Sequence, residues 1–430
     1  MIDTSASSRF RIAALLALAA AMPLAVAHAS GPAGTGDDTV FADGFDGYTI
    51  YPGFIGVDLV NATGGVWNDA DVHVTVIGID PATGTFAHVA PDGAITDIAV
   101  ADNDAPGHLV KNGVNYPAYG FTLAQSRLLK LPKMAGGRVF ISLGEPVYLR
   151  VMPGGDGHPG YAGPNPQNPG DPNVDVHFDW YEFTWDDAGL WINTTQVDQF
   201  GLPMQLDVRG DGGAFHQRTG ITESIAAIDA AFASEVPPEF HPAPIDDLRI
   251  LSPTKVGFGN GGANATYFDG YVAAIWSQYA SAPLVIDLFG GTRRFSGTTT
   301  GDELVFSEVD LHNGAYVGNT YRVGRPDTVD ILQCSGTMAH GDPNPDINTV
   351  QLALEAQICA AFNRHAMHDV AIWRTPSAWY AAAPANFYAA FWHRHSIDAL
   401  AYGFAYDDVA EQSSTITTPA PEHMTFTIGW

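Results

Sequence analysis

The most regular pattern of polar and apolar residues in the chain lies between Tyr181 and Asp186. Glu182, Thr184 and Asp186 fall on one face of an extended strand, and the aromatic residues between them fall on the other. This alternation predicts a strand with a polar stripe over an aromatic floor.

Similar patterns divide the chain into β-rich and mixed parts. Residues 48 to about 208 contain short β-branched and aromatic runs separated by turn signals such as Gly136-Gly137, which is typical of strands. Apolar residues then recur at helical spacing, which predicts a mixed α/β part before the chain becomes β-rich again near its end. Strands are predicted at 72–79, 138–151, 284–288, 303–309 and 424–430, and helices at 222–236, 268–279 and 350–362.

These elements give the expected organisation. We expect a tether at 30–47, β-rich segments at 48–215 and 385–430, and a mixed α/β segment at 216–384. Residues 153–172 are so rich in Pro, Gly and Asn that they predict a long loop with neither regular element.

The N-terminus has the pattern of a secretory signal. Arg9 and Arg11 precede an apolar run from Ile12 to Ala21, and Ala27-His28-Ala29 supplies the small residues of a cleavage site after Ala29. No other stretch approaches the roughly 18 apolar residues of a membrane span. We therefore expect an exported, soluble protein that does not use the membrane as a partner.

The amino-acid composition argues against two further classes of binding partner. The chain has 47 Asp and Glu against 19 Lys and Arg, for a net charge of −28, which would repel nucleic acid and anionic membranes. Solubility outside the cell explains this acidity. The two cysteines, Cys334 and Cys359, most simply form one disulfide in an oxidising compartment, while a thiol nucleophile is the alternative.

The strand at 181–186 also brings candidate chemistry. A chain reversal near Gly189-Leu190 would place Asp198 opposite Glu182 and Gln196 opposite Thr184. Two facing carboxylates can supply the general acid and the general base of glycosidic bond cleavage, with aromatic faces to hold sugar rings. A solvated, acidic sheet face is an equally good explanation of these residues taken alone.

Other motifs are weaker. Gly257 to Gly262 matches G-x-G-x-x-G, but the context favours a plain glycine loop. No metal site is predicted from the histidines, whose spacing is not that of HExxH, and no G-x-S-x-G or Walker A motif occurs. These histidines are His365, His368, His393 and His395.

The segment "FTWDDAGLWINTTQVDQFGLP" at 183–203 resembles the signature of glycoside hydrolase family 64, the thaumatin-like β-1,3-glucanases. Further segments resemble blocks of that family in the same order: "GRVFISLGEPVYL" at 137–149, "YFDGYVAAIW" at 267–276, the 334–364 segment, and "NFYAAFWHRHSIDALAYGFAYDDV" at 386–409. The resemblance covers most of residues 48–430. It implies a mainly β fold, a thaumatin-like sandwich or barrel, joined to a mixed α/β subdomain around a wide groove.

The resemblance also implies roles for individual residues. Glu182 corresponds to the general acid and Asp198 to the general base of an inverting hydrolase. Thr184, Asp186 and Trp191 fall on positions that line glucan subsites, although the family more often has Asn where this chain has Asp186. Asn193, Thr194 and Gln196 lie in the same motif, where bonding within the turn is favoured over sugar contact.

The implied function is a secreted endo-type β-1,3-glucanase that releases short oligosaccharides, typically a pentasaccharide, and needs no cofactor. We expect a monomer whose partner is β-1,3-glucan. The alternative is a non-catalytic thaumatin-like protein that binds β-glucan. A secreted structural or interaction protein is a third possibility, with only the acidic composition behind it.

Overall fold

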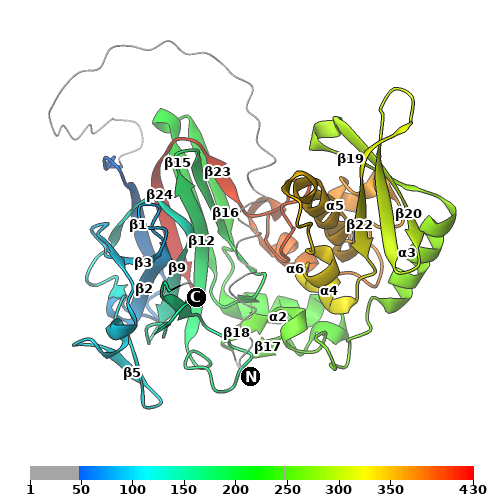
Figure 1. Ribbon diagram of the computed structural model, residues 1–430. Helices are drawn as coiled ribbons and strands as arrows, with labels where there is room; N and C mark the ends of the chain where they lie inside the picture. The colour runs from blue at the N-terminus through cyan, green and yellow to red at the C-terminus, as the bar shows by residue number, and fades with distance from the viewer. Residues whose placement is uncertain (1–47, 156, 246) are drawn as a thin grey trace, which may run out of the picture.

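The computed structural model describes residues 48–155, 157–245 and 247–430, which form two parts side by side (Figure 1). One part is a sandwich of two β-sheets, and the other combines helices with a smaller sheet. The predicted leader at 1–29 and tether at 30–47 lie outside the described residues.

The sandwich consists of a five-stranded and an eight-stranded sheet. The strands of the smaller sheet are antiparallel except for β1 and β24, which run parallel. Its order is β16 (Phe215–Gly220), β15 (Met204–Gly210), β24 (Pro421–Gly429), β1 (Ile55–Ala62) and β8 (Leu128–Leu131). The larger sheet runs β23 (Ile416–Thr418), β13 (Gly189–Thr194), β12 (His177–Asp186), β9 (Met134–Leu143), β2 (Val72–Ile79), β3 (Phe86–Val89) and β4 (Ile95–Asp97), and β7 (Phe121–Thr122) also pairs with β2.

The core of the sandwich explains the aromatic alternation in β12. Tyr181, Phe183 and Trp185 point between the sheets, where they are buried with the apolar residues of β1, β2, β9, β15 and β24. The ring of Tyr181 stacks on Phe426 of the opposite sheet at 4.1 Å between centroids. Burial of this face leaves the even-numbered residues of β12 on the outer face of the sheet.

The outer face of β12 is covered at its beginning and open at its end. Phe178 and Trp180 are buried in a separate apolar cluster with Phe140, Tyr148 and Val151. Glu182, Thr184 and Asp186, further along the strand, are only partly buried. Short hairpins lie over the covered end: β5 (Leu109–Lys111) with β6 (Val114–Tyr116), and β10 (Arg150–Met152) with β11 (Gly160–Ala162).

The second part has its own apolar core between helices and an antiparallel sheet. The sheet runs β19 (Leu284–Leu288), β20 (Arg293–Thr300), β21 (Glu303–Val309) and β22 (Tyr316–Gly324). The helices are α2 (Ile225–Glu235), α3 (Asp269–Ser281), α4 (Thr328–Gln333), α5 (Pro345–Asn363) and α6 (Phe387–His395). A small third sheet consists of β14 (Gln199–Phe200), β18 (Arg249–Leu251) and β17 (Pro244–Ile245). Its strand β14 comes directly after the sandwich strand β13 in the chain.

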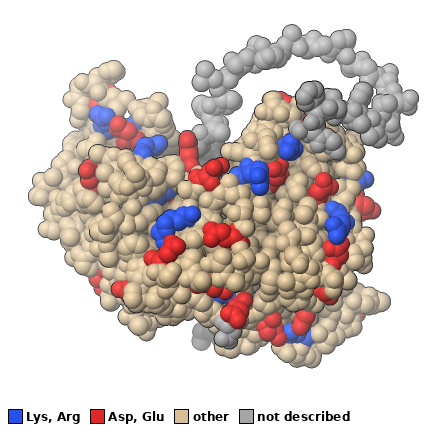
Figure 2. Space-filling model, turned by 180° about the vertical axis from the view of Figure 1, so that it is seen from behind, with Lys and Arg blue, Asp and Glu red and all other residues tan. Residues whose placement is uncertain are grey.

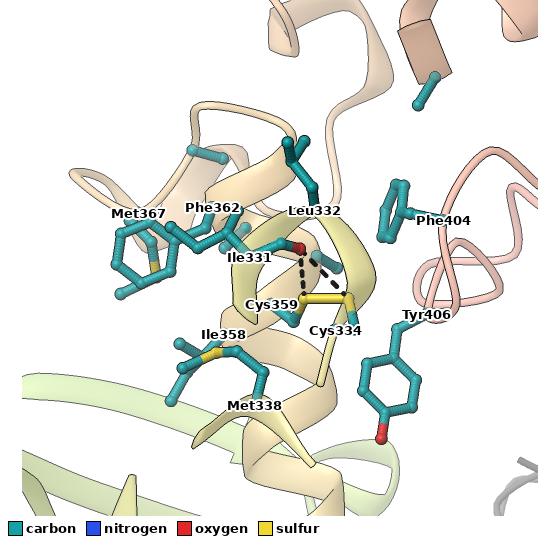
Figure 3. Close-up of a cluster of buried hydrophobic side chains, with 14 of the residues drawn as sticks. Ile331, Leu332, Cys334, Met338, Ile358, Cys359, Phe362, Met367, Phe404 and Tyr406 are labelled. Atoms are coloured by element: carbon teal, nitrogen blue, oxygen red, sulfur yellow. Dashed lines mark hydrogen bonds between the residues drawn. A yellow bond between two sulfur atoms is a disulfide. The ribbon is translucent and has the colours of Figure 1, made fainter. Parts of the chain in front are cut away.

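A disulfide joins Cys334 and Cys359, which confirms the predicted pairing. Cys334 ends α4 and Cys359 lies near the end of α5, so the bond links the two helices inside the core of the α/β part (Figure 3). The carbonyl oxygen of Ile331 lies 3.2 Å from the sulfur of Cys359. Figure 3 also places Phe404 and Tyr406, from the segment after α6, beside the cysteines. In the chain-entropy picture, closing a loop of 25 residues stabilises the fold by roughly 3 to 4 kcal/mol.

Most predicted elements are present, but three boundaries differ. The segment 385–430 begins with helix α6, not strands, because Phe391 and Trp392 pack into the core of the α/β part. The first β-rich segment continues through β16 to Gly220, beyond the predicted limit at 215. The predicted loop 153–172 contains the short strand β11, which pairs with β10.

Charged side chains are spread over the surface. On the face shown in Figure 2, acidic and basic groups are interspersed and separated by wide areas with neither. Among the described residues, no helix has the length and apolar run that a membrane crossing needs.

Candidate active site

The hairpin of β12 and β13 sets the geometry of the site. Its strands pair Glu182 with Asn193 and Thr184 with Trp191. The chain reverses earlier than predicted, at Asp187-Ala188, where the Asp186 carboxylate accepts the Ala188 N–H at 2.7 Å. The predicted register is therefore wrong, and Asn193 takes the position opposite Glu182 that was expected for Asp198.

Glu182 is held from one side. Its Oε1 accepts hydrogen bonds from Arg138 Nη2 at 3.0 Å and from Trp180 Nε1 at 3.1 Å. Arg138 lies opposite Glu182 on β9 and stacks over the Trp180 ring at 5.2 Å. Oε2 makes no hydrogen bond to the described residues, and the side chain is 34 % exposed. One carboxyl oxygen is thus fixed by two donors, while the other has no hydrogen-bond partner among the described residues.

Asp198 lies between β13 and β14, where the chain runs beside β18 before it returns to the sandwich in β15. Its carboxylate is 42 % exposed and forms an ion pair with Lys255. Burial raises the pKa of the Asp198 carboxyl, but the Lys255 ammonium and the Arg138 guanidinium outweigh burial, and the pKa lies below its usual value. Asp198 is therefore a carboxylate at neutral pH.

Arg138 connects the two acids electrostatically. Burial alone would lower the pKa of its guanidinium, yet the charges of Glu182 and Asp198, with Tyr161 of β11, keep that pKa above its ordinary value. Both carboxylates thus act on the same cation, although they are not cross-strand neighbours.

The segment after Asp198 is anchored to the beginning of β12. Buried Asp179 accepts the N–H groups of Gly201 at 2.7 Å and Leu202 at 3.3 Å. Burial raises the pKa of Asp179 to about 7, against the effect of these hydrogen bonds. Arg249 donates to the carbonyl of Val176 at 2.6 Å and to Gln199 Oε1 at 3.2 Å. The main chain on the far side of Asp198 is therefore fixed relative to the strand that carries Glu182.

Three predicted sugar-contact residues share the outer face with Glu182. Thr184 accepts the Gly136 N–H at 3.1 Å, at a bulge between β12 and β9. Trp191 lies opposite Thr184 and is half-buried, so it is not a core residue. Asn193 has a buried Oδ1 without a hydrogen-bond partner among the described residues. The outer face of the sheet therefore presents an aromatic ring and polar groups next to the Glu182 carboxyl.

The other predicted contacts are engaged in local structure. Thr194 is 2 % exposed and points to the core side of β13. Gln196 is 4 % exposed, and its main chain donates to the Tyr402 carbonyl at 2.9 Å and accepts the Tyr388 hydroxyl at 2.7 Å. Together with the Asp186 bond to Ala188, these contacts favour structural roles, and sugar contact by the three residues stays a prediction.

Sequence patterns missed two residues of the site. Lys255 lies 57 positions from Asp198, in a loop without periodicity, so no local signal connects the two. Arg138 stands on a predicted strand, but only the observed register places it opposite Glu182.

The four histidines singled out in the sequence contact other groups of the protein. His393 contacts Asp407, His395 contacts Glu223 and Glu235, His365 contacts the Pro384 carbonyl, and His368 contacts the Tyr271 hydroxyl. Within the described residues, no group of three or more His, Cys, Asp or Glu is placed to bind a metal ion. The glycines from 257 to 262 form turns, as a plain loop would.

A partly exposed carboxyl on a strand face that also carries an aromatic ring, with a second carboxylate near the same cation, is an arrangement expected of a glycoside hydrolase. The comparison with known families agrees. The model of glycoside hydrolase family 64, described as β-1,3-glucanase, matches residues 53–428, and the chain belongs to this family.

Individual relatives give the same result. The chain is 30 % identical over 312 residues to a glucan endo-1,3-beta-glucosidase of Cellulosimicrobium cellulans, covering 69 % of this chain and 53 % of the relative. It thus spans about half the length of the curated relatives it matches. A β-1,3-glucanase domain from Clostridium beijerinckii has 36 % identity and a TM-score of 0.81, over 89 % of this chain and 99 % of that one.

A second solved structure contains a ligand. It is a laminaripentaose-producing β-1,3-glucanase from Paenibacillus barengoltzii in complex with laminarihexaose. Its identity to this chain is 32 % and its TM-score 0.69, over 88 % of this chain and 75 % of that one.

Proposed function

We propose that this protein is a secreted endo-type β-1,3-glucanase that hydrolyses β-1,3-glucan to short oligosaccharides with inversion at the anomeric carbon. The observation that carries the proposal is the hydrogen bond of Arg138 to Glu182 on the open strand face with Trp191, and the effect of the Asp198 charge on the same cation supports it. Family membership and the glucanases named above support the substrate class.

Glu182 acts as the general acid in this proposal. The proton on its Oε2 goes to the glycosidic oxygen as the bond to the anomeric carbon breaks. Arg138 and Trp180 donate to Oε1 and stabilise the carboxylate that remains after proton transfer. Arg138 and Trp180 therefore favour the carboxylate form of Glu182, which the proton transfer produces.

Asp198 acts as the general base. It removes a proton from a water molecule whose oxygen attacks the anomeric carbon on the face opposite the leaving group. Its lowered pKa keeps it ionised at the start of each cycle. After the reaction Glu182 has lost a proton and Asp198 has gained one, and solvent restores both.

The observed register supports inversion over retention. A directly opposed pair on neighbouring strands would bring the carboxyls to roughly the 5 Å of a retaining enzyme. Asn193 occupies that opposed position, and Asp198 comes after the end of β13. The pair is thus not held at cross-strand distance, which favours the wider spacing that an inverting enzyme needs for its water molecule.

The rival proposal, a non-catalytic glucan-binding protein, predicts a different outcome in a simple assay. Incubation with insoluble β-1,3-glucan should release soluble reducing sugar if the protein is an endo-glucanase. Co-sedimentation with the glucan without sugar release would support the binding protein. If the protein neither releases sugar nor co-sediments, β-1,3-glucan is not its substrate or ligand.

Export is a further part of the proposal and rests on the leader at 1–29. The mass of protein recovered from the culture medium tests it. A mature chain that begins at Ser30 supports cleavage after Ala29, and retention of the leader contradicts it.

Trp191→Ala is expected to weaken glucan binding by roughly 1 to 3 kcal/mol, because a half-buried indole on the open face can stack on a sugar ring. Binding to laminarihexaose by calorimetry, with melting temperature measured in parallel, checks this. Trp185→Ala is the matched control, since Trp185 is 8 % exposed in the sandwich core and should lower the melting temperature instead. An unchanged affinity of folded Trp191→Ala for laminarihexaose would show that Trp191 does not stack on a sugar ring.

A further inference from the structure

Lys255 makes a contact with Asp198 that the proposed mechanism has not used. Its Nζ pairs with Asp198 Oδ1, and no contact of Oδ2 with the described residues is seen. The Lys255 side chain is 16 % exposed, against 42 % for Asp198. The ammonium side chain is thus more buried than the carboxylate with which it pairs.

The main chain around Lys255 is tied to the same residue. Lys255 ends a short 3₁₀ helix, Pro253–Lys255, and the Ser252 N–H just before it donates to the Asp198 carbonyl at 3.1 Å. Within the helix, the Thr254 hydroxyl accepts from Gln333 at 2.9 Å. Asp198 is therefore bound through its main chain and its side chain by one anchored segment.

Three ionisable groups face Asp198 from the elements around it. Lys255 approaches from the 3₁₀ helix, Arg138 from β9 and Tyr388 from α6. Burial raises the pKa of Tyr388 well above its usual value, so this phenol is neutral. Its hydroxyl donates a hydrogen bond to the Gln196 carbonyl at 2.7 Å. Lys255 contributes more than Arg138 to lowering the pKa of Asp198.

We propose that Lys255 is a positioning residue of the hydrolysis, which holds Asp198 as an oriented carboxylate and extends the activity of the enzyme toward acidic pH. This inference rests on the proposed function, in which Asp198 is the base. Lys255 touches neither sugar nor water in this scheme and acts only through Asp198.

The direction of the pH effect follows from the ion pair. A base works only when deprotonated, so activity falls as pH drops through the pKa of Asp198. An adjacent cation lowers that pKa, and its removal raises it. Because the pair is partly exposed, we expect the acidic limb of kcat/KM to move up by roughly 1 pH unit in Lys255→Met, the low end of the usual range for such a neighbour.

The experiment compares pH profiles of kcat and kcat/KM on laminarihexaose for the wild type, Lys255→Met, Lys255→Gln and Lys255→Arg. Lys111→Met is the control, because Lys111 is 15 % exposed and pairs with Glu145 and Asp175 away from the site. Circular dichroism identifies the pH range over which each variant is folded. Lys255→Gln replaces Lys255→Met if the latter does not fold.

The proposal predicts roughly tenfold lower kcat/KM below the acidic limb in the neutral variants, recovery at higher pH, and a limb near that of the wild type in Lys255→Arg. Lys111→Met should keep the wild-type profile. An unshifted limb, or an equal loss at every pH, overturns the role of Lys255. Asp198→Asn separates the two proposals, since a wild-type rate in that variant would overturn the base assignment itself.

Discussion

Replacement of Glu182 by Gln, or of Asp198 by Asn, is expected to lower hydrolysis of β-1,3-glucan by roughly 10² to 10⁴-fold each. Gln cannot protonate the leaving oxygen, and Asn cannot remove a proton from water. Both substitutions keep the size of the side chain, so folding and glucan binding should change little. Initial rates of reducing-sugar release, with binding measured separately, check this result.

Matched controls come from carboxylates of similar exposure in the α/β part. Glu303, 46 % exposed and paired with Arg322, controls for Glu182. Asp287, 43 % exposed and paired with Arg294, controls for Asp198. Glu303→Gln and Asp287→Asn should hydrolyse glucan at the wild-type rate, and a wild-type rate in either site variant would refute the corresponding role.

The leaving group distinguishes the acid from the base. An oligosaccharide carrying an acidic phenol as leaving group needs little protonation, so it should restore much of the rate in Glu182→Gln but not in Asp198→Asn. Equal restoration in both variants would contradict the assignment of separate roles.

The second large effect concerns stability. Arg364, at the end of α5, donates to the carboxylate of Asp407 at 3.0 Å, and both side chains are almost fully buried. Arg364→Met should destabilise the protein by roughly 3 to 5 kcal/mol, because it removes one of the two cationic partners, Arg364 and His393, of the buried Asp407. Denaturant unfolding measures the change.

Its surroundings make Arg364 hard to replace. Burial raises the pKa of Asp407, but the His393 and Arg364 charges outweigh it and hold the pKa below its usual value. Asp407 also accepts the Gly403 N–H at 2.9 Å, next to Tyr402, whose carbonyl binds Gln196. Loss of Arg364 should therefore disturb the segment beside the active site as well as the core.

The surface pair of Arg294 and Asp287 is the control for this variant. Its two hydrogen bonds measure 2.7 and 2.8 Å, but both side chains are more than 40 % exposed. Arg294→Met should cost less than about 1 kcal/mol. Equal costs for Arg364→Met and Arg294→Met would show that burial of the Arg364 pair has no special effect on stability.

Local patterns predicted the parts of the fold whose causes are local. The alternation at 181–186 identified both the buried and the open face of β12, because side chains of a strand alternate regardless of its partners. Amphipathic spacing located α2, α3 and α5 within a few residues. The cysteine pair was predictable because the leader pattern predicts export, and two cysteines in an oxidising compartment leave few alternatives.

The remaining features depend on contacts between distant segments. Helix α6 has aromatic residues around much of its surface, and only its packing against Phe200 and Phe232 identifies it as a core helix. The hairpin reverses at Asp187-Ala188, two residues before the predicted position at Gly189-Leu190. Sequence alone does not determine a turn position to within two residues. Lys255 reaches Asp198 through the fold of the whole α/β part, and no spacing rule could have found it.

Proton NMR of the nascent reducing end, recorded before mutarotation, tests the central claim most directly. If Glu182 is the acid and Asp198 activates water, cleavage of a β-1,3 bond must first release the α-anomer. Initial accumulation of the β-anomer would contradict the account, because it would require a covalent glycosyl-enzyme intermediate with Asp198 as the nucleophile.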